Sequence, residues 1–211
     1  SSAFGTRTGT TKSAFFNFDS DFGGFLEGGY YAGKITRADG VYALIVSPKA
    51  TGQAPTTLAW KNANTTSGGC KSLNDGAANT AYLVSAGNAT VYPAAHFCNN
   101  LVINGFSDWY LPARDELEIA YRNLKPTTEA NYTAARNKSS YVYTLNNDVS
   151  GDTQGVNRHS VPAGAAYTAS VPAQTSIALF RDGGSESFGE SPETSHDRHW
   201  SSTEHSSTIS W

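Results

Sequence analysis

Residues 104–126 read NGFSDWYLPARDELEIAYRNLKP, and this stretch carries the clearest fold signal in the sequence. Trp109 and Leu111 alternate with Tyr110, so their side chains can face a core together. Pro112 then fixes the turn into a helix, which Lys125-Pro126 stops. Apolar residues recur along one face of that helix at Leu117, Ala120, Tyr121 and Leu124. The expected core residues of the stretch are Trp109, Leu111, Pro112, Leu117 and Tyr121.

Three carboxylates, Asp115, Glu116 and Glu118, lie in the first turns of this predicted helix. Acidic side chains favour the positive end of the helix dipole and can cap the helix start, which explains them without a catalytic role. No G-x-S-x-G occurs, and the phosphate-loop-like GTRTGTTKS at residues 5–13 has the wrong spacing. The sequence therefore predicts neither a nucleophile nor a phosphate site, and we expect no enzyme.

The chain before this stretch predicts a hairpin and one further helix. Runs rich in β-formers at Tyr30–Ile35 and Val41–Ser47 flank an Asp-Gly turn, which is a hairpin signal. A helix is expected at Tyr92–Leu101, with Pro93 in its first turn. We also expect a short strand at Leu58–Trp60 and a loop over residues 61–80. Strands and helices are segregated along the chain, which favours the α+β class.

Residues 1–27 are rich in Gly, Ser, Thr and Phe. The phenylalanines have neither the period of a strand nor that of a helix, and Asp and Gly residues interrupt them. We interpret the segment either as an extended arm that needs another surface or as a core strand of the same domain. With an arm at residues 1–27, the folded domain covers residues 28–211.

Residues 127–199 are loop-like, with ordered pieces expected at Tyr141–Leu145 and Ile177–Phe180. The end of the chain, HWSSTEHSSTISW at residues 199–211, predicts one or two strands. Loops this long are uncommon without a function, and aromatic and small polar side chains suit binding. The candidate ligand-binding residues are Tyr167, Ser202, Glu204, His205, Ser207 and Trp211, whereas Trp200 is expected in the core.

Composition and charge narrow the possible partners. The 211 residues carry a net charge of −3 with scattered Lys and Arg, so we expect no nucleic-acid partner. No apolar run approaches the roughly 20 residues of a membrane span, so we expect no membrane insertion. Cys70 and Cys98 can form one disulfide or remain two buried thiols. No cofactor is expected and no metal, because the run His196-Asp197-Arg198-His199 is polar and lacks further ligand spacing.

Several motifs together resemble one family. Its hallmark is a Gly, then Asp-Trp, Leu-Pro and a helix that begins with Glu-Leu, here Gly105, residues 108–112, Glu116 and Leu117. HWSSTE at residues 199–204 resembles its Trp-Ser-Ser-Thr-Glu strand, and GGYYAGKI, YALIVSPKA and AAHFCNNLVINGF resemble other segments. From about Gly28 to Trp211 the chain is thus similar to the Lcl C-terminal-domain-like family of bacterial adhesins and bacteriophage tail or fibre proteins.

This resemblance implies a C-type-lectin-like fold with two helices, short antiparallel strands and long ordered loops. It implies a non-enzymatic receptor-binding or adhesin module that recognises a cell-surface glycan or protein, in a virion tail or surface, on a bacterial surface or secreted. Other virion or adhesin subunits are implied as partners, and a homo-oligomer is expected. The alternative is a structural virion protein, of tail or capsid, that uses residues 1–27 for assembly. Family members continue with two closing strands, which we expect from more of the chain or from another chain.

Overall fold

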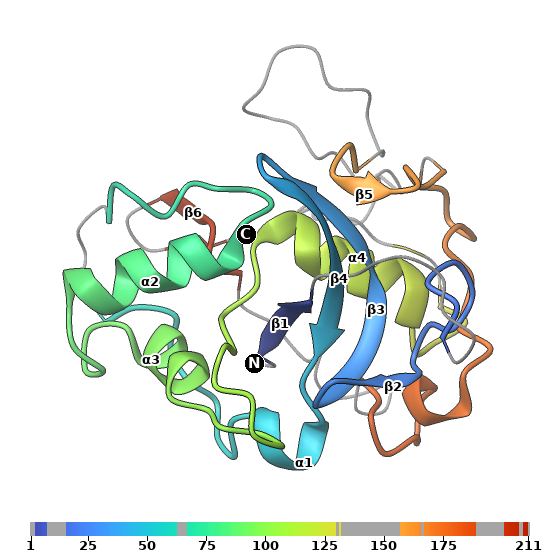
Figure 1. Ribbon diagram of the computed structural model, residues 1–211, viewed down its shortest axis with the longest axis horizontal. Helices are drawn as coiled ribbons and strands as arrows, with labels where there is room; N and C mark the ends of the chain where they lie inside the picture. The colour runs from blue at the N-terminus through green and yellow to red at the C-terminus, as the bar shows by residue number, and fades with distance from the viewer. Residues whose placement is uncertain are drawn as a thin grey trace.

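An antiparallel sheet of five strands runs through the centre of the protein (Figure 1). The computed structural model describes residues 3–7, 16–62, 67–129, 131, 157–165, 167–188, 201–206 and 209–210. The strand order is β1-β4-β3-β2, and β5 pairs with β3 further along that strand. The strands are β1 Phe4–Arg7, β2 Phe25–Leu26, β3 Gly29–Arg37, β4 Gly40–Val46 and β5 Ser160–Val161. A separate pair, β6 Glu204–Ser206 and β7 Ile209–Ser210, confirms the strands expected near the end of the sequence.

The predicted hairpin is confirmed in the long β3–β4 pair, where Arg37 lies opposite Gly40 at the turn. A bulge between Tyr31 and Gly33 disturbs the register of β3. Gly33 has a φ of +145°, and a Cβ there would lie 2.6 Å from Cγ2 of Ile119. Glycine at this position therefore lets helix α4, Arg114–Leu124, approach the strand closely.

Helices pack on both faces of the sheet. On one face, Ile119 and Leu124 of α4 form a buried cluster with Leu44. On the other, helices α2 (Gly76–Ala86) and α3 (Pro93–Asn99) form a second buried cluster with Ile45. Figure 1 shows α4 running behind β4 and β3, and α2 and α3 lying to the left of β1. Neighbouring residues of β4 thus point into different cores, which is why the strand is apolar at almost every position.

Two helices were expected, and the described residues contain four. The helix predicted between Pro112 and Lys125 is confirmed as α4, and the one predicted at Tyr92–Leu101 is confirmed as α3. A single turn, α1, covers Lys49–Gly52. The loop expected over residues 61–80 is wrong from Gly76 onward, because α2 begins there. Asp75 caps α2 by accepting a hydrogen bond from the Ala78 backbone N–H at 3.0 Å.

The buried side of α2 explains why the sequence did not indicate a helix. Asn79 and Thr80 are both buried, next to Leu83. The Thr80 hydroxyl pairs with both the carbonyl and the N–H of Leu111, at 3.2 and 3.0 Å. Because polar residues fill the inner face, no apolar repeat marks it.

The N-terminal segment belongs to the core of its own domain. Strand β1 pairs along its length with β4, and Phe4 is fully buried. Phe16, Phe18 and Phe22 surround the ring of Tyr31 at centroid distances of 5.4, 5.3 and 5.6 Å. Phe16, Phe18 and Phe22 lack a regular period because they gather around one tyrosine, whereas Phe25 lies on β2, is 57% exposed and packs against Tyr30. For the described residues up to 27, the core alternative holds and the extended arm is wrong.

The structure also bears on the predictions for the two cysteines and for several short segments. Cys70 and Cys98 are both buried and both free, so they are two thiols and the disulfide alternative is wrong. Leu58–Trp60 is not a strand, although Trp60 is buried. The ordered piece expected at Ile177–Phe180 is confirmed as a 3-10 turn, Ala178–Phe180, and the one at Tyr141–Leu145 lies outside the described residues. No helix in the described part has the length and apolar character to cross a membrane.

Candidate functional site

The two sequence segments that carry the family resemblance touch each other. The backbone N–H of Ser202 donates to the carbonyl of Pro112 at 2.7 Å. The N–H of Arg114, in the first turn of α4, donates to Oγ1 of Thr203 at 3.1 Å, and the Thr203 hydroxyl donates to the carbonyl of Ser72 at 2.7 Å. Ser202 and Thr203 therefore fasten the start of α4 to the loop that precedes α2.

Glu204, the next residue, makes several hydrogen bonds within the protein. Its carboxylate is buried and accepts the backbone N–H groups of Ser67, at 2.9 and 3.0 Å, and of Gly68 at 3.3 Å. Nζ of Lys61 lies 3.4 Å away, also buried. Successive backbone N–H groups around one anion form a nest, here occupied by a side chain of the same protein.

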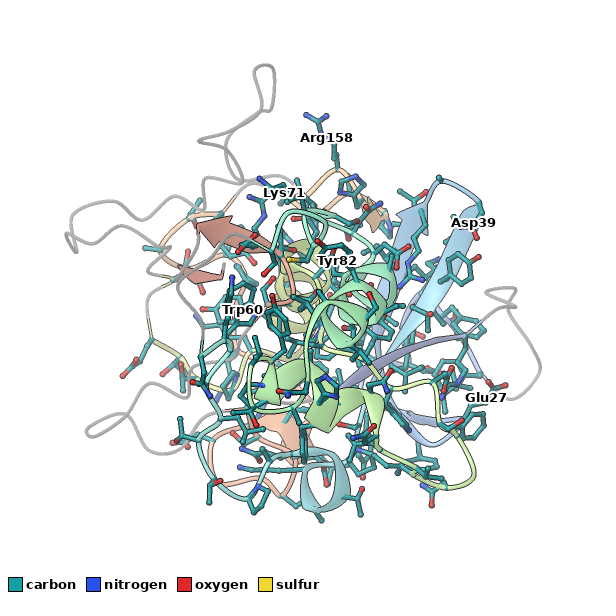
Figure 2. The ribbon with its side chains drawn as sticks, turned by 90° about the vertical axis from the view of Figure 1, so that its left-hand side faces the viewer. Glu27, Asp39, Trp60, Lys71, Tyr82 and Arg158 are labelled. Atoms are coloured by element: carbon teal, nitrogen blue, oxygen red, sulfur yellow. The ribbon has the colours of Figure 1, made fainter. Side chains whose placement is uncertain are left out.

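Lys61 also donates to the hydroxyl of Ser67 at 3.0 Å, and that hydroxyl pairs with the Tyr92 hydroxyl at 3.0 Å. A serine beside a lysine is a known arrangement for nucleophilic catalysis. Here Ser67, Lys61 and Tyr92 are all buried, next to the buried ring of Trp60, which Figure 2 labels. Because these side chains are buried and hydrogen-bonded to one another, the geometry favours an internal, structural role.

The expectation that Tyr167, Ser202 and Glu204 are surface contacts for a ligand is wrong, because all three are buried. Ser202 accepts a hydrogen bond from Asn79 Nδ2 at 3.2 Å, and the Tyr167 hydroxyl donates to Glu118 at 2.8 Å. Serine, threonine and tyrosine in a polar run look the same whether they face solvent or a buried network. The side chain of His205 is not described, and Ser207, Trp211 and Trp200 lie outside the described residues.

Most of the predicted core residues are confirmed. Trp109, Leu111 and Pro112 are buried, and Leu117 is half-buried against the cluster on the α4 face. Tyr121 is the exception, since its side chain is 38% exposed. It lies at the flank of α4, where its ring stacks on Tyr167 at 6.2 Å. The apolar repeat of the helix is real, but the face that meets the sheet is centred on Ile119, so Tyr121 falls outside it.

The three carboxylates at the start of α4 bind side chains from other segments of the chain. Oδ2 of Asp115 lies 2.6 Å from Nδ1 of His159, in the segment that leads into β5. Glu118 accepts the Asn157 side-chain amide at 2.6 Å, from the same segment, and Nε of Arg122 at 2.8 Å. Sequence reasoning assigned these acids only to the helix dipole and capping, and it missed that tertiary partners bury them.

Glu116 is the most deeply buried of the three. It accepts hydrogen bonds from Arg37 Nη2 at 2.8 Å, from the Tyr110 hydroxyl at 3.0 Å and from the Ala113 backbone N–H at 2.7 Å. The last bond confirms the capping role at the helix start. Burial raises the pKa of the Glu116 carboxyl to about 7, although Arg37 and the other donors act in the opposite direction. Burial also raises the pKa of Tyr110 well above 10.0, so its hydroxyl stays a donor.

The raised pKa of Glu116 predicts a pH dependence of stability. The folded carboxyl has a pKa of about 7 and the unfolded one 4.5, so between these values the folded state binds more protons. The free energy of unfolding contributed by this group should therefore be greatest below pH 4.5 and fall as the pH rises through 7. The expected slope is at most about 1.4 kcal/mol per pH unit. Urea unfolding of the wild type and Glu116→Gln at several pH values tests this, since parallel curves for the two proteins would contradict it.

A groove lies where four segments of the chain meet beside α4. Its volume is about 340 Å³, near the lower end of the roughly 300–1,000 Å³ of small-ligand sites. The lining combines two aromatic rings, two cations, one carboxylate, one amide and a run of small residues: Phe18, Asp19, Phe22, Gly33, Lys34, Arg122, Asn123 and residues 160–164. No signal in the sequence marked it, because its residues are spread over the N-terminal segment, β3, α4 and the segment from β5.

Arg122, which lines the groove, is held in place by two hydrogen bonds and a cation–π contact. Its Nε donates to Glu118 at 2.8 Å, its Nη1 donates to the carbonyl of Ala165 at 2.7 Å, and its guanidinium lies over the Tyr167 ring at 4.7 Å. A Cβ on Gly164 would lie 2.3 Å from Cζ of Arg122, so any larger residue there would have to displace the guanidinium from this position. Lys34 also lines the groove, and its Nζ lies 2.7 Å from Oδ1 of Asp19.

Within the described residues, no cluster of three or more His, Cys, Asp or Glu side chains could hold a metal ion. The run at residues 196–199 lies outside them, and the Glu204 carboxylate is bound by backbone N–H groups. Comparison with known proteins is also negative: no protein-family model, curated protein or solved structure matches this chain.

Proposed function

We propose that this protein is a non-enzymatic binding module with a C-type-lectin-like scaffold of the Lcl C-terminal-domain type. In this proposal it recognises a cell-surface glycan or protein, as a receptor-binding domain of a phage tail or fibre or as a bacterial adhesin domain. The observation that carries the proposal is the groove beside α4. It joins an aromatic wall to charged and hydrogen-bonding groups, which is the composition of a ligand site.

The contacts around α4 support a binding role over a catalytic one. Asp115, Glu116 and Glu118 are buried and bonded to partners within the protein, and none of the three lines the groove, where a general acid or base would have to reach a substrate. The family-like residues around Pro112 and Ser202 also join segments of the chain to one another. A rigid scaffold that holds long segments in place is typical of folds that bind through variable loops.

A glycan fits this groove better than an extended protein surface does. The groove is small and concave, whereas protein interfaces are large and mostly flat. Sugar rings have an apolar face and a rim of hydroxyl groups, which match aromatic side chains beside an amide and backbone carbonyls. The alternative role in virion assembly drew on a free Phe-rich arm. Among the described residues of that segment, Phe16, Phe18 and Phe22 instead pack around Tyr31, and only Phe25 is largely exposed, so this part of the chain does not support a free arm.

Blocking the groove should abolish binding. Ala163 is exposed and lines the groove, so Ala163→Trp places a large ring in it without removing a contact. Ala165 is also exposed but does not line the groove, which makes Ala165→Trp a matched control. We expect Ala163→Trp to weaken binding by about tenfold or more and the control to bind like the wild type. Glycan arrays and binding to bacterial cells, both with fluorescently labelled protein, measure this.

Two results would count against the proposal. Wild-type protein that binds no glycan and no bacterial cell surface would exclude the binding role. Binding that survives Ala163→Trp would show that another surface makes the contact. Thermal unfolding of both variants shows whether the fold is retained, since two exposed positions should change stability little.

A further inference from the structure

Resting on the proposed function, the charges of the groove assign its class of ligand. We propose that the groove binds a sugar that carries a carboxylate, with the ring against Phe18 and Phe22 and the carboxylate on Lys34. Three charged residues line the groove: Lys34, Arg122 and Asp19. The proposal depends on which of these charges is available to a ligand.

Lys34 is the available cation. Its side chain is only 14% exposed, and its one ion-pair partner among the described residues is Asp19, whose side chain is 72% exposed. An ion pair with an exposed partner contributes about 0–1 kcal/mol, so a ligand can displace Asp19 from the ammonium at little cost. The backbone of Lys34 is fixed between β4 and β5, so its side chain extends from a rigid part of the groove. An incoming carboxylate would thus exchange a weak exposed partner for a sheltered, charge-assisted hydrogen bond.

Arg122 is not available in the same way. Its charge is balanced by the buried carboxylate of Glu118, and its Nη1 is bonded to the Ala165 carbonyl. Its Nη2 is buried, without a hydrogen-bond partner in the described part of the chain, and so offers no donor at the groove surface. One accessible ammonium suits a singly charged carboxylate, whereas a phosphate carries more charge and requires several donors.

The other groups of the lining fit the rest of a sugar. Phe22 stacks on Tyr31 with an interplanar angle of 5°, so the aromatic wall is fixed before a ligand arrives. Nδ2 of Asn123 donates to the carbonyl of Ala32 at 2.7 Å, which orients the amide beside the groove. A pre-ordered wall reduces the entropy lost on binding, and this favours a small, rigid ligand such as a terminal sugar.

The test compares carboxylated sugars with their neutral forms. Oligosaccharides ending in glucuronic acid or N-acetylneuraminic acid are immobilised beside the same compounds with the carboxyl reduced to an alcohol. An acidic peptide and a phosphorylated sugar complete the panel. We expect wild-type protein to prefer the carboxylated sugars by about tenfold or more, as for a charge-assisted hydrogen bond. Lys34→Gln should remove this preference, Lys34→Arg should keep most of it, and Asp19→Asn should raise affinity by up to about fivefold.

Lys71→Gln is the matched control, because it removes the same charge from an exposed lysine that does not line the groove (Figure 2). This inference would be overturned if the protein bound neutral and carboxylated sugars equally well and Ala163→Trp blocked both. The proposed binding function would still hold in that case. A preference for the acidic peptide or the phosphorylated sugar would overturn it as well. Failure to bind any glycan or cell would remove the proposed function and this inference with it.

Discussion

Trp109→Ala should lower the free energy of unfolding by about 3–5 kcal/mol, the range for truncating a large buried aromatic side chain. The Trp109 side chain is almost fully buried in the core on the α2 and α3 face. Its Nε1 donates to the carbonyl of Phe106 at 3.0 Å, and the guanidinium of Arg7 lies 5.5 Å from its ring. The substitution leaves a large cavity and removes a hydrogen bond and a cation–π contact together.

The neighbouring Asp108 shows why the Asp-Trp pair acts as a unit. It accepts a 2.6 Å hydrogen bond from Nη1 of Arg7, and the same guanidinium lies over the ring of Phe106 at 4.3 Å. Arg7 belongs to β1, so the pair fixes the first strand of the chain onto a turn about a hundred residues later. Losing Trp109 should therefore loosen β1 as well as the core.

Equilibrium unfolding in urea measures the effect, with far-UV circular dichroism to show that the variant folds. Val102→Ala is the control, because that side chain is 71% exposed in the same part of the chain and should change stability by less than about 0.5 kcal/mol. A loss below about 1 kcal/mol for Trp109→Ala would contradict the core role assigned to it.

The hairpin and the turn at residues 109–112 could be predicted from sequence because their signals are local. An Asp-Gly between two apolar runs specifies a turn, and alternation separates Trp109 from Tyr110. What alternation could not show is that both sides are buried, since Tyr110 packs on the α4 face and Trp109 on the other. Both sides are buried only because helices cover both faces of the sheet. One of these helices, α2, could not be predicted because its sequence has no apolar repeat.

The candidate binding residues were misjudged for a related physical reason. Ser202, Glu204 and Tyr167 have side chains that serve equally well at a surface or in a buried network. Their partners, such as Gly68 and Glu118, are far away in the sequence, so no local pattern could reveal them. The groove was missed in the same way, because each of its four segments supplies only a few residues.

Glu116→Ala is expected to cost about 3–5 kcal/mol, since removing one partner of a buried ion pair leaves the other charge uncompensated. The side chain of Arg37 is 11% exposed, and among the described residues it would keep only Asp75, at 3.6 Å, as an acidic partner. The hydroxyl of Tyr110 and the backbone N–H of Ala113 would lose their acceptor at the same time. Each unsatisfied buried donor adds to the loss.

Two further variants separate the charge from the packing. Asp19→Ala removes a carboxylate from an exposed ion pair with Lys34 and should cost no more than about 1 kcal/mol. The triple variant Arg37→Met, Tyr110→Phe and Glu116→Leu replaces the polar side chains by apolar ones and should recover much of the loss, because only the backbone N–H of Ala113 then still lacks the acceptor that Glu116 supplied. Urea unfolding at pH 8, where the Glu116 carboxyl is ionised in the folded protein, gives the three values. If Glu116→Ala and Asp19→Ala lose equally little, the buried pair does not hold α4 to the sheet, and the polar cluster around Glu116 contributes far less to stability than its geometry implies.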